Sequence, residues 1–220
     1  MSGGQATAKP RRHSAQGEDR KAMLLRHAEE LFAEQGFAKT RMADIARHAG
    51  VAKGLVYWYF DSKEALVHAV ILDLRRRLRS AQTAAIRDLD PLAGIYVGTV
   101  VAVCFIAEHH RLYGLLNNVV GAPLLATAVA ESVQAHADDA ARALREAQEA
   151  GAVRRDESPQ IMAVGNSGVV NNAVLMFVTG LLPGTVEEVA HGAGRYVLHA
   201  VAADPALVEA VIAEHGPADD

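Results

Sequence analysis

One short segment concentrates the side chains that could bind a charged partner. Residues 53–60 read KGLVYWYF, so a lysine and a glycine lead into an unbroken aromatic run. Ammonium and phenol groups donate hydrogen bonds to phosphate oxygens, and aromatic rings pack against sugars or a thymine methyl group. The segment therefore raises one question: whether these rings fill an interior or face a partner.

The spacing of the flanking residues predicts how this segment is held. Apolar residues recur at helical intervals from Glu18 until Gly36, and Thr40 is a candidate N-cap for a short second helix that ends at Gly50. Only about three residues separate Gly50 from the next helical segment, 54–60. Two helices joined so closely must cross steeply, which predicts a helix-turn-helix.

In such a unit the second helix of the pair enters the major groove of DNA with its N-terminal residues foremost. Lys53 and Gly54 would therefore lead the helix into the groove. Val56 and Phe60 fall on one face and are expected in a small core with residues that include Phe32, Ile45 and Ala49. The tyrosines Tyr57 and Tyr59 would then lie largely towards DNA, whereas Trp58 could equally pack against the first helix.

The same region resembles the N-terminal DNA-binding domain of the TetR family of transcriptional regulators. The resemblance rests on these elements: Gly36-Phe37, Thr40, Asp44-Ile45-Ala46, Ala49-Gly50-Val51, Gly54, Tyr57-x-Tyr59-Phe60 and Ser62-Lys63-Glu64-x-Leu66. It implies that the residues that contact double-stranded DNA are Thr40, Arg41, Lys53, Gly54, Leu55, Tyr57, Trp58, Tyr59 and Lys63. Arg41 and Leu55 depart from the family's usual residues, which bears on phosphate contact and base preference.

Charge and composition agree with this division. Residues 1–80 contain 15 Lys and Arg against 9 Asp and Glu, whereas the whole chain of 220 residues has a net charge of −4. A basic N-terminal part joined to an acidic remainder indicates that only the first part meets a polyanion. Only 5% of the residues are aromatic and half are hydrophobic, mostly alanine, leucine and valine, without sustained strand alternation. We therefore predict an all-α fold.

The predicted domains follow from helix signals along the chain. Residues 1–17 are expected to form a disordered basic arm, residues 18–64 the three-helix DNA-binding domain, and a helix over 62–80 the link. Residues 81–220 are expected to form a helical ligand-binding and dimerisation domain. Its predicted helix starts are Asp90-Pro91, Ser158-Pro159, the Thr185–Glu188 capping box and Asp204-Pro205.

By resemblance, helices over about 159–182 and 185–203 would pair with their copies in a homodimer. Small residues recur along both: Ala163, Gly165, Gly168, Ala173, Ala190, Ala193 and Gly194. The alternative is that these helices form only an internal core.

The helices over about 91–151 would enclose a cavity for a small, mainly apolar effector. The candidate ligand-binding residues are Cys104, Phe105, His109, Tyr113, Asn117, Asn171, Asn172 and Met176. For the two adjacent asparagines, a hydrogen bond across the dimer or within the core stays equally open.

Other classes of function lack support in the sequence. No nucleophile elbow, phosphate-binding loop or dinucleotide fingerprint appears, so we expect neither an enzyme nor a cofactor. Cys104 is the single cysteine, and His109 and His110 point about 100° apart on a helix, so we expect no metal site. No segment was expected to span a membrane, and the N-terminus lacks a secretory signal, which favours a cytoplasmic protein.

The expected function is that of a ligand-responsive transcriptional regulator. It would be a repressor that binds a palindromic operator as a homodimer and is released by its effector. The alternative is an architectural DNA-binding dimer without a small-molecule ligand.

Overall fold

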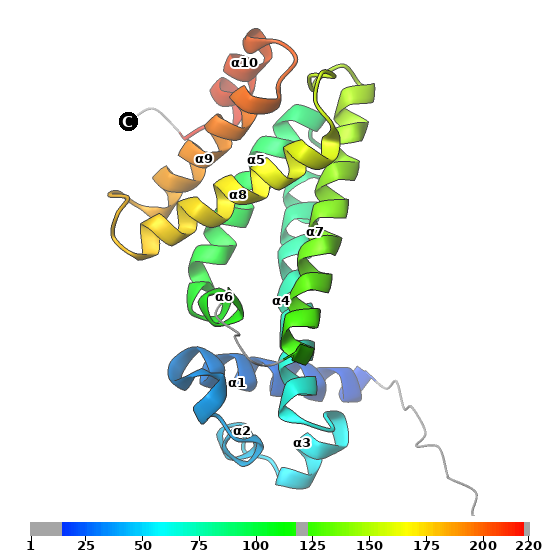
Figure 1. The fold of residues 1–220 in the computed structure, drawn as a ribbon, viewed down its shortest axis with the longest axis vertical. Helices are drawn as coiled ribbons and strands as arrows, with labels where there is room; N and C mark the ends of the chain where they lie inside the picture. The colour runs from blue at the N-terminus through cyan, green and yellow to red at the C-terminus, as the bar shows by residue number, and fades with distance from the viewer. Residues whose placement is uncertain (1–14, 118–122, 218–220) are drawn as a thin grey trace, which may run out of the picture. The chain divides into compact units, whose positions relative to one another are not determined.

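The computed structural model describes residues 15–117 and 123–217, and these residues form helices joined by short connections (Figure 1). The all-α prediction is confirmed. The helices are α1 (Ala15–Lys39), α2 (Met42–His48), α3 (Lys53–Tyr59), α4 (Lys63–Ile86), α5 (Pro91–Glu108), α6 (His110–Asn117), α7 (Pro123–Glu149), α8 (Pro159–Val178), α9 (Val186–Val201) and α10 (Pro205–His215).

Most of the predicted helix starts are confirmed. The side chains of Asp90, Ser158, Thr185 and Asp204 each accept a hydrogen bond from the first turn of the helix that follows. The Ser62 hydroxyl caps α4, because it accepts from the Ala65 amide. The predicted N-cap of the second helix is wrong: the cap is Arg41, and Thr40 lies outside the helix.

Two boundaries also differ from the prediction. The first helix begins at Ala15, three residues before the predicted start, and α4 continues to Ile86 instead of ending at 80. Residues 1–14, which hold most of the predicted arm, lie outside the described residues.

The chain divides into two compact units, 1–70 and 71–220. In the first unit, α1, α2 and α3 share a small core of Leu24, Ala28, Phe32, Ile45, Val56 and Phe60. Helix α1 is kinked at Gly36, whose φ of 82° lies in the left-handed region that glycine adopts without a steric penalty. Beyond this kink the chain returns to pack α2 against α1, and α3 packs against α2.

The second unit is built around α5, which contacts α7, α8, α9 and α10. Tyr96 is fully buried at its centre, and its hydroxyl lies 2.7 Å from His191 Nδ1 on α9. Close packing of α5 and α9 depends on Gly194, where a Cβ atom would lie 2.7 Å from the Tyr96 ring. Helices of this unit thus approach each other through a small residue placed opposite a large one.

Two helices, α5 and α8, are long and apolar enough to span a membrane by length and composition alone. This differs from the expectation that no segment would qualify. Helix α5 is a core helix of the second unit, and α8 carries Asn166, Asn171 and Asn172 within its apolar sequence. The apolar character of α5 is accounted for by burial inside this unit.

Helix α8 leaves an apolar face exposed. Along this face lie Ile161, Val164, Gly165, Gly168, Asn171, Asn172, Leu175 and Val178. Leu175 keeps 53% of its surface exposed, and Tyr196 on the neighbouring α9 keeps 65%. We call this set, together with Tyr196, the α8–α9 face.

The small residues of α8 and α9 therefore divide between two roles. Gly165 and Gly168 lie on the α8–α9 face with open space around them, whereas Ala163, Ala190, Ala193 and Gly194 are buried inside the second unit. The prediction that the small residues would together serve a dimer interface is wrong for the buried ones, which pack within the chain.

Replacing Gly194 with alanine is expected to destabilise the protein, because the new methyl group overlaps the buried Tyr96 ring. Gly94→Ala is the matched control, since its Cβ would meet only Ile86 at an ordinary 3.8 Å. Both changes gain helix propensity of about 1 kcal/mol, so their difference isolates the overlap, about 1–3 kcal/mol against G194A. Urea unfolding at one protein concentration measures this difference, and equal stabilities would contradict the packing described.

Candidate nucleic-acid interface and cavity

Helix α3 presents a cationic and aromatic surface. Lys53 and Gly54 are exposed at its start, and Tyr57 and Trp58 keep 42% and 51% of their surface exposed. The Lys53 ammonium lies 5.5 Å from the centroid of the Tyr57 ring, a cation–π distance. A Cβ atom added to Gly54 would have no atom within 4 Å, so the backbone of another molecule can approach closely there. Leu55 is half-buried beside these residues.

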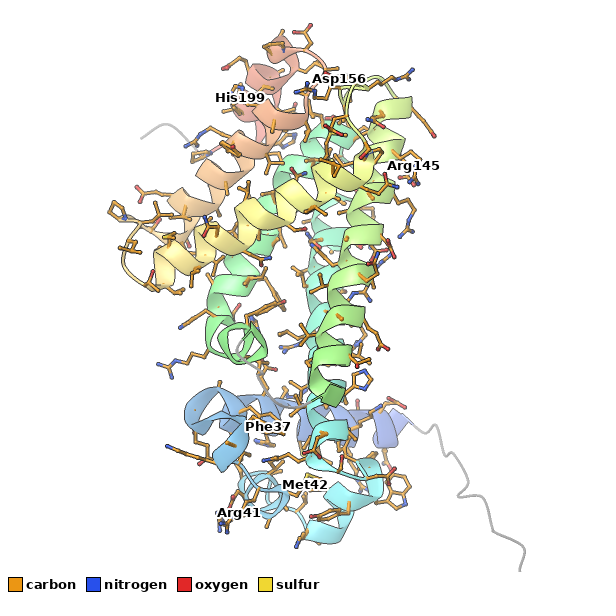
Figure 2. The ribbon with its side chains drawn as sticks, viewed as in Figure 1. Phe37, Arg41, Met42, Arg145, Asp156 and His199 are labelled. Atoms are coloured by element: carbon orange, nitrogen blue, oxygen red, sulfur yellow. The ribbon has the colours of Figure 1, made fainter. Side chains whose placement is uncertain are left out.

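Helix α2 and its N-cap residue add two guanidinium groups. Figure 2 shows Arg41 projecting outward from α2, while the adjacent Met42 points inward, in agreement with its burial. The Asp44 carboxylate accepts from the Arg41 amide and forms an ion pair with Arg47. Arg47, whose side chain is 79% exposed, was not among the predicted DNA-contact residues. Its position one turn beyond Asp44 in the same short helix could have indicated a further phosphate contact.

Three predicted contact residues make contacts inside the first unit instead. Thr40 is fully buried, and its hydroxyl donates to the Gly36 carbonyl at 2.8 Å. Its side chain is therefore removed from the predicted DNA-contact set, because a buried hydroxyl cannot reach a phosphate. The Tyr59 hydroxyl donates to the Gly17 carbonyl at 3.1 Å, so the phenol is half-buried against α1.

Lys63 also has an internal partner. Its ammonium donates to the Phe37 carbonyl at 2.8 Å and lies 4.1 Å from the centroid of the Phe37 ring. An ammonium has three N–H donors, so two remain for a phosphate. Lys63 thus connects the start of α4 to the end of α1. Its contact with a DNA phosphate remains a prediction.

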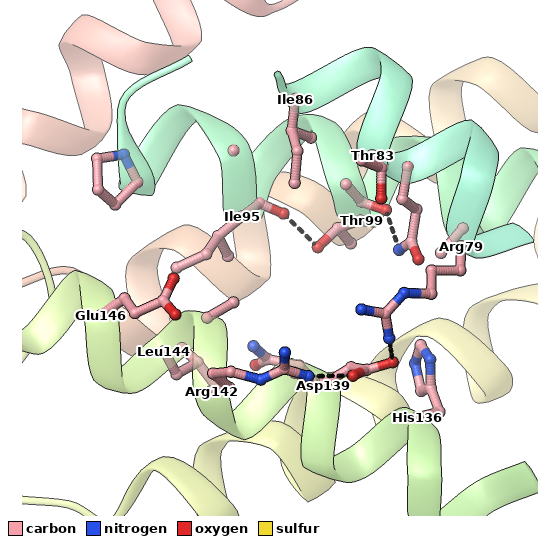
Figure 3. Close-up of a pocket in the computed structure, with 18 of the residues that line it drawn as sticks. Arg79, Thr83, Ile86, Ile95, Thr99, His136, Asp139, Arg142, Leu144 and Glu146 are labelled. Carbon is pink, nitrogen blue, oxygen red and sulfur yellow. Dashed lines mark hydrogen bonds and ion pairs between the residues drawn. The ribbon is translucent and has the colours of Figure 1, made fainter. Parts of the chain in front are cut away.

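A cavity of about 450 Å³ lies within the second unit, among α4, α5, α7 and α8. Figure 3 shows it in close-up, with Ile86, Ile95 and Leu144 on its apolar walls. Thr83, Thr99, Asn166 and Ser167 add polar groups to the lining. A volume of this order is typical of small-molecule sites.

One end of the cavity carries a concentration of positive charge. The Asp139 carboxylate on α7 accepts from Arg75 at 3.0 Å, and it also bonds Arg79 and Arg142. Three guanidinium groups thus share one carboxylate, and each retains donors that Asp139 does not use. Glu146 lies two helical turns beyond Asp139 on α7 and one turn beyond Arg142, so an acidic group borders the cationic end of the lining (Figure 3).

His136 lies beside Asp139 and Arg79 in the lining (Figure 3). Burial, and secondarily the positive charge of Arg75, lower the pKa of the His136 imidazole below its usual value. The ring is therefore neutral at neutral pH, and its unprotonated nitrogen can accept a hydrogen bond.

The predicted ligand residues lie elsewhere. Cys104, Phe105 and Tyr113 pack against a core cluster around Val103 and Ile106, and the His109 ring stacks on Phe105 at 4.3 Å. Burial, and then Glu187, raise the pKa of the Cys104 thiol, as expected for a packed cysteine. The structure brings Phe105 and His109 together, but neither lines the cavity.

The predicted ligand residues of α8 also lie outside the cavity lining. Asn171 and Asn172 are exposed on the α8–α9 face, and the cavity receives Asn166, Ser167 and Val170 from this helix instead. Met176 is half-buried and outside the cavity lining. Asn117 ends α6, and its side chain lies outside the described residues.

The actual lining was missed for a definable reason. Arg75, Arg79, Gln82, Thr83 and Ile86 recur at helical spacing on α4. A stripe of this kind has the same periodicity as a solvated face, so the sequence does not distinguish the two. His136, Asp139, Ala143 and Glu146 form the corresponding stripe on α7.

Comparison with known proteins agrees with the architecture of the first unit. Residues 24–70 match the model of the bacterial regulatory proteins of the tetR family. The first unit carries the DNA-binding domain of the TetR family of transcriptional regulators. The matched region contains the α2–α3 pair and the exposed groups of α3, so the resemblance seen in the sequence is confirmed.

Curated proteins similar to part of this chain are regulators. It is 36% identical over 84 residues to ArpR of Pseudomonas putida, which covers 37% of this chain and 40% of ArpR. It is 34% identical over 104 residues to the transcriptional repressor KstR2 of Mycobacterium tuberculosis, covering 46% of this chain and 50% of KstR2. The chain therefore matches these relatives over half of their length or less. These relatives are regulators rather than enzymes, as predicted.

Solved structures extend the similarity of fold to the second unit. A Rhodococcus protein assigned to the family has a TM-score of 0.73 at 20% identity, covering 83% of this chain and 96% of that one. The fatty acid degradation regulator FadR of Bacillus halodurans has a TM-score of 0.72 at 18% identity, covering 80% and 97%. At these identities the likeness concerns the fold.

Proposed function

We propose that the protein is a transcriptional repressor that binds a palindromic DNA operator through α2 and α3. The observation that carries the proposal is the exposed surface of α3, where Lys53 and Gly54 lead the helix and Tyr57 and Trp58 follow. A lysine at the start of a recognition helix reaches a guanine edge or a phosphate, and exposed rings pack on sugars. Arg41 and Arg47 supply further phosphate contacts from α2. The site of action is the cytoplasm, where the DNA is.

The repressor acts as a homodimer joined through the α8–α9 face. Burying apolar surface of this extent needs a partner, and a second copy presents the same face in an isologous contact. Gly165 and Gly168 permit the two copies of α8 to approach closely. Asn171 and Asn172 lie within the same face, where each can donate and accept hydrogen bonds across the contact.

The effector binds in the cavity of the second unit. The apolar walls accept a hydrocarbon or aromatic body, and the guanidinium groups of Arg75, Arg79 and Arg142 accept a carboxylate or a comparable anion. This refines the expectation of a mainly apolar effector: the charged end of the lining favours a small organic acid.

Release from DNA follows from linkage between the two sites. The effector binds better to a conformation of the dimer whose α3 helices do not fit successive major grooves, so the operator is lost. Helix α4 begins in the first unit and supplies Arg75 and Arg79 to the cavity, which makes it the element that links the sites. A coupling free energy of about 1–3 kcal/mol would change operator affinity 5- to 150-fold.

An architectural DNA-binding dimer is the alternative. A second unit filled by its own side chains would have favoured it. The cavity among α4, α5, α7 and α8 supports the ligand-responsive function instead.

Lys53→Ala is expected to weaken binding to a duplex selected from a random pool by about 5- to 150-fold, because it removes a contact at the start of α3. Arg145→Ala, which removes the same charge from the second unit, is the matched control. Fluorescence anisotropy over a salt series measures both. Equal losses for the two variants, or no duplex enriched by the wild-type protein, would contradict the DNA-binding surface.

Leu175→Arg is expected to raise the dimer dissociation constant by about 100-fold or more, since it buries a charge in the α8–α9 face. Leu72→Arg changes another exposed leucine, on α4, and is expected to leave the dimer intact. Sedimentation velocity separates the 23.4 kDa chain from its dimer. The dimer proposal is overturned if the wild-type protein sediments as a monomer at micromolar concentration.

A shape-matched pair of probes tests the effector chemistry. 4-Phenylbutyrate is expected to bind more tightly than 4-phenylbutylamine, and Arg79→Gln should weaken binding of the acid by about tenfold, because a charge-assisted hydrogen bond is lost. Arg145→Gln, on α7 but outside the cavity lining, is the control (Figure 2). Isothermal titration calorimetry measures each Kd, and a preference for the amine would reverse the assigned charge of the effector.

A further inference from the structure

Three potential metal ligands converge in the first unit, and none of them is assigned to DNA. His27 and Glu30 lie on α1, and His48 is the last residue of α2. The Glu30 Oε2 atom lies 3.2 Å from His27 Nδ1 and 3.6 Å from His48 Nδ1. All three ligand atoms lie within 4.8 Å of one another.

The same packing that builds the helix-turn-helix brings these residues together. His27 and Glu30 are three residues apart on α1 and therefore share one face of the helix. Burial of Ala28, Leu31 and Ile45 between α1 and α2 fixes the distance of His48 from this pair. The two imidazole rings meet edge to face with centroids 5.0 Å apart. Both Nδ1 atoms lie near the same oxygen of the Glu30 carboxylate.

These distances are close to those that a metal ion requires. Zinc binds imidazole nitrogen and carboxylate oxygen at about 2.0–2.2 Å, which in a tetrahedral site separates ligand atoms by roughly 3.4 Å. The two measured nitrogen–oxygen distances fall on either side of this value, so small side-chain movements suffice to admit an ion. Hydrogen bonds from two histidines to one glutamate would give similar distances, and only metal binding distinguishes the two states.

We propose that His27, Glu30 and His48 form a Zn²⁺ site that ties α1 to α2. Two imidazoles and a carboxylate are the ligand types that suit zinc, and three protein ligands leave a fourth position for water. The ion would cross-link the two helices on which α3 rests. The site is independent of the effector cavity and departs from the expectation of no metal site, which considered only adjacent histidines.

Untagged full-length protein, freed of metal by a chelator that is then removed, tests the site. Zinc chloride is expected to bind with a stoichiometry of one ion per chain through these residues and to raise the midpoint of thermal unfolding, because the ion binds only the folded arrangement. Cobalt chloride should give visible ligand-field absorption that zinc displaces. Removing one ligand of three, in His48→Gln or Glu30→Gln, is expected to weaken zinc binding about tenfold or more.

His199→Gln is the matched control, since this histidine is exposed on α9 outside the cluster (Figure 2). It should retain both the zinc affinity and the thermal shift. Glu30 is exposed, so Glu30→Gln is expected to fold even if a histidine variant does not, and circular dichroism verifies this. Zinc binding that is absent in the wild-type protein, or equal in Glu30→Gln and wild type, overturns the proposal.

Discussion

Burial of Val56 and Phe60 in the core of the first unit is the constraint on which the proposed DNA surface depends. Residues four apart lie on one side of a helix, so burying both sets the rotation of α3 about its axis. Lys53, Tyr57 and Trp58 remain exposed on the same helix. The aromatic run is therefore divided: Phe60 is interior, and Tyr57 and Trp58 are exposed.

The polar contacts around this core hold the helices in place. Thr40, Tyr59 and Lys63 each donate to a main-chain carbonyl of α1 or of the residues that end it. Each bond is modest by itself, about 1 kcal/mol net, but a buried donor left without an acceptor costs more. Residue types that are common in DNA contacts here also stabilise the domain, so a substitution at these positions affects both properties.

In the second unit, packing around Tyr96 leaves two features that helix packing alone does not fill. One is the α8–α9 face, which an isolated chain would expose to water at a free-energy cost. The other is the cavity, where Asp139 offsets only part of the charge of three arginines. In the proposed function, a second copy would cover the face and an anionic effector would bind the remaining donors in the cavity.

The helices, most of their caps, the helix-turn-helix and the family resemblance could be predicted from the sequence, because these depend on local spacing and on side chains near in the chain. The interior positions of Val56 and Phe60 were also predicted correctly. The polar stripe that encloses the cavity could not be predicted, since Arg75, Asp139 and Asn166 come together from three helices far apart in sequence. The burial of Thr40 and the exposure of Asn171 likewise depend on packing between helices. The physical reason is that periodicity identifies a face of a helix, whereas the neighbour that covers this face is chosen by packing.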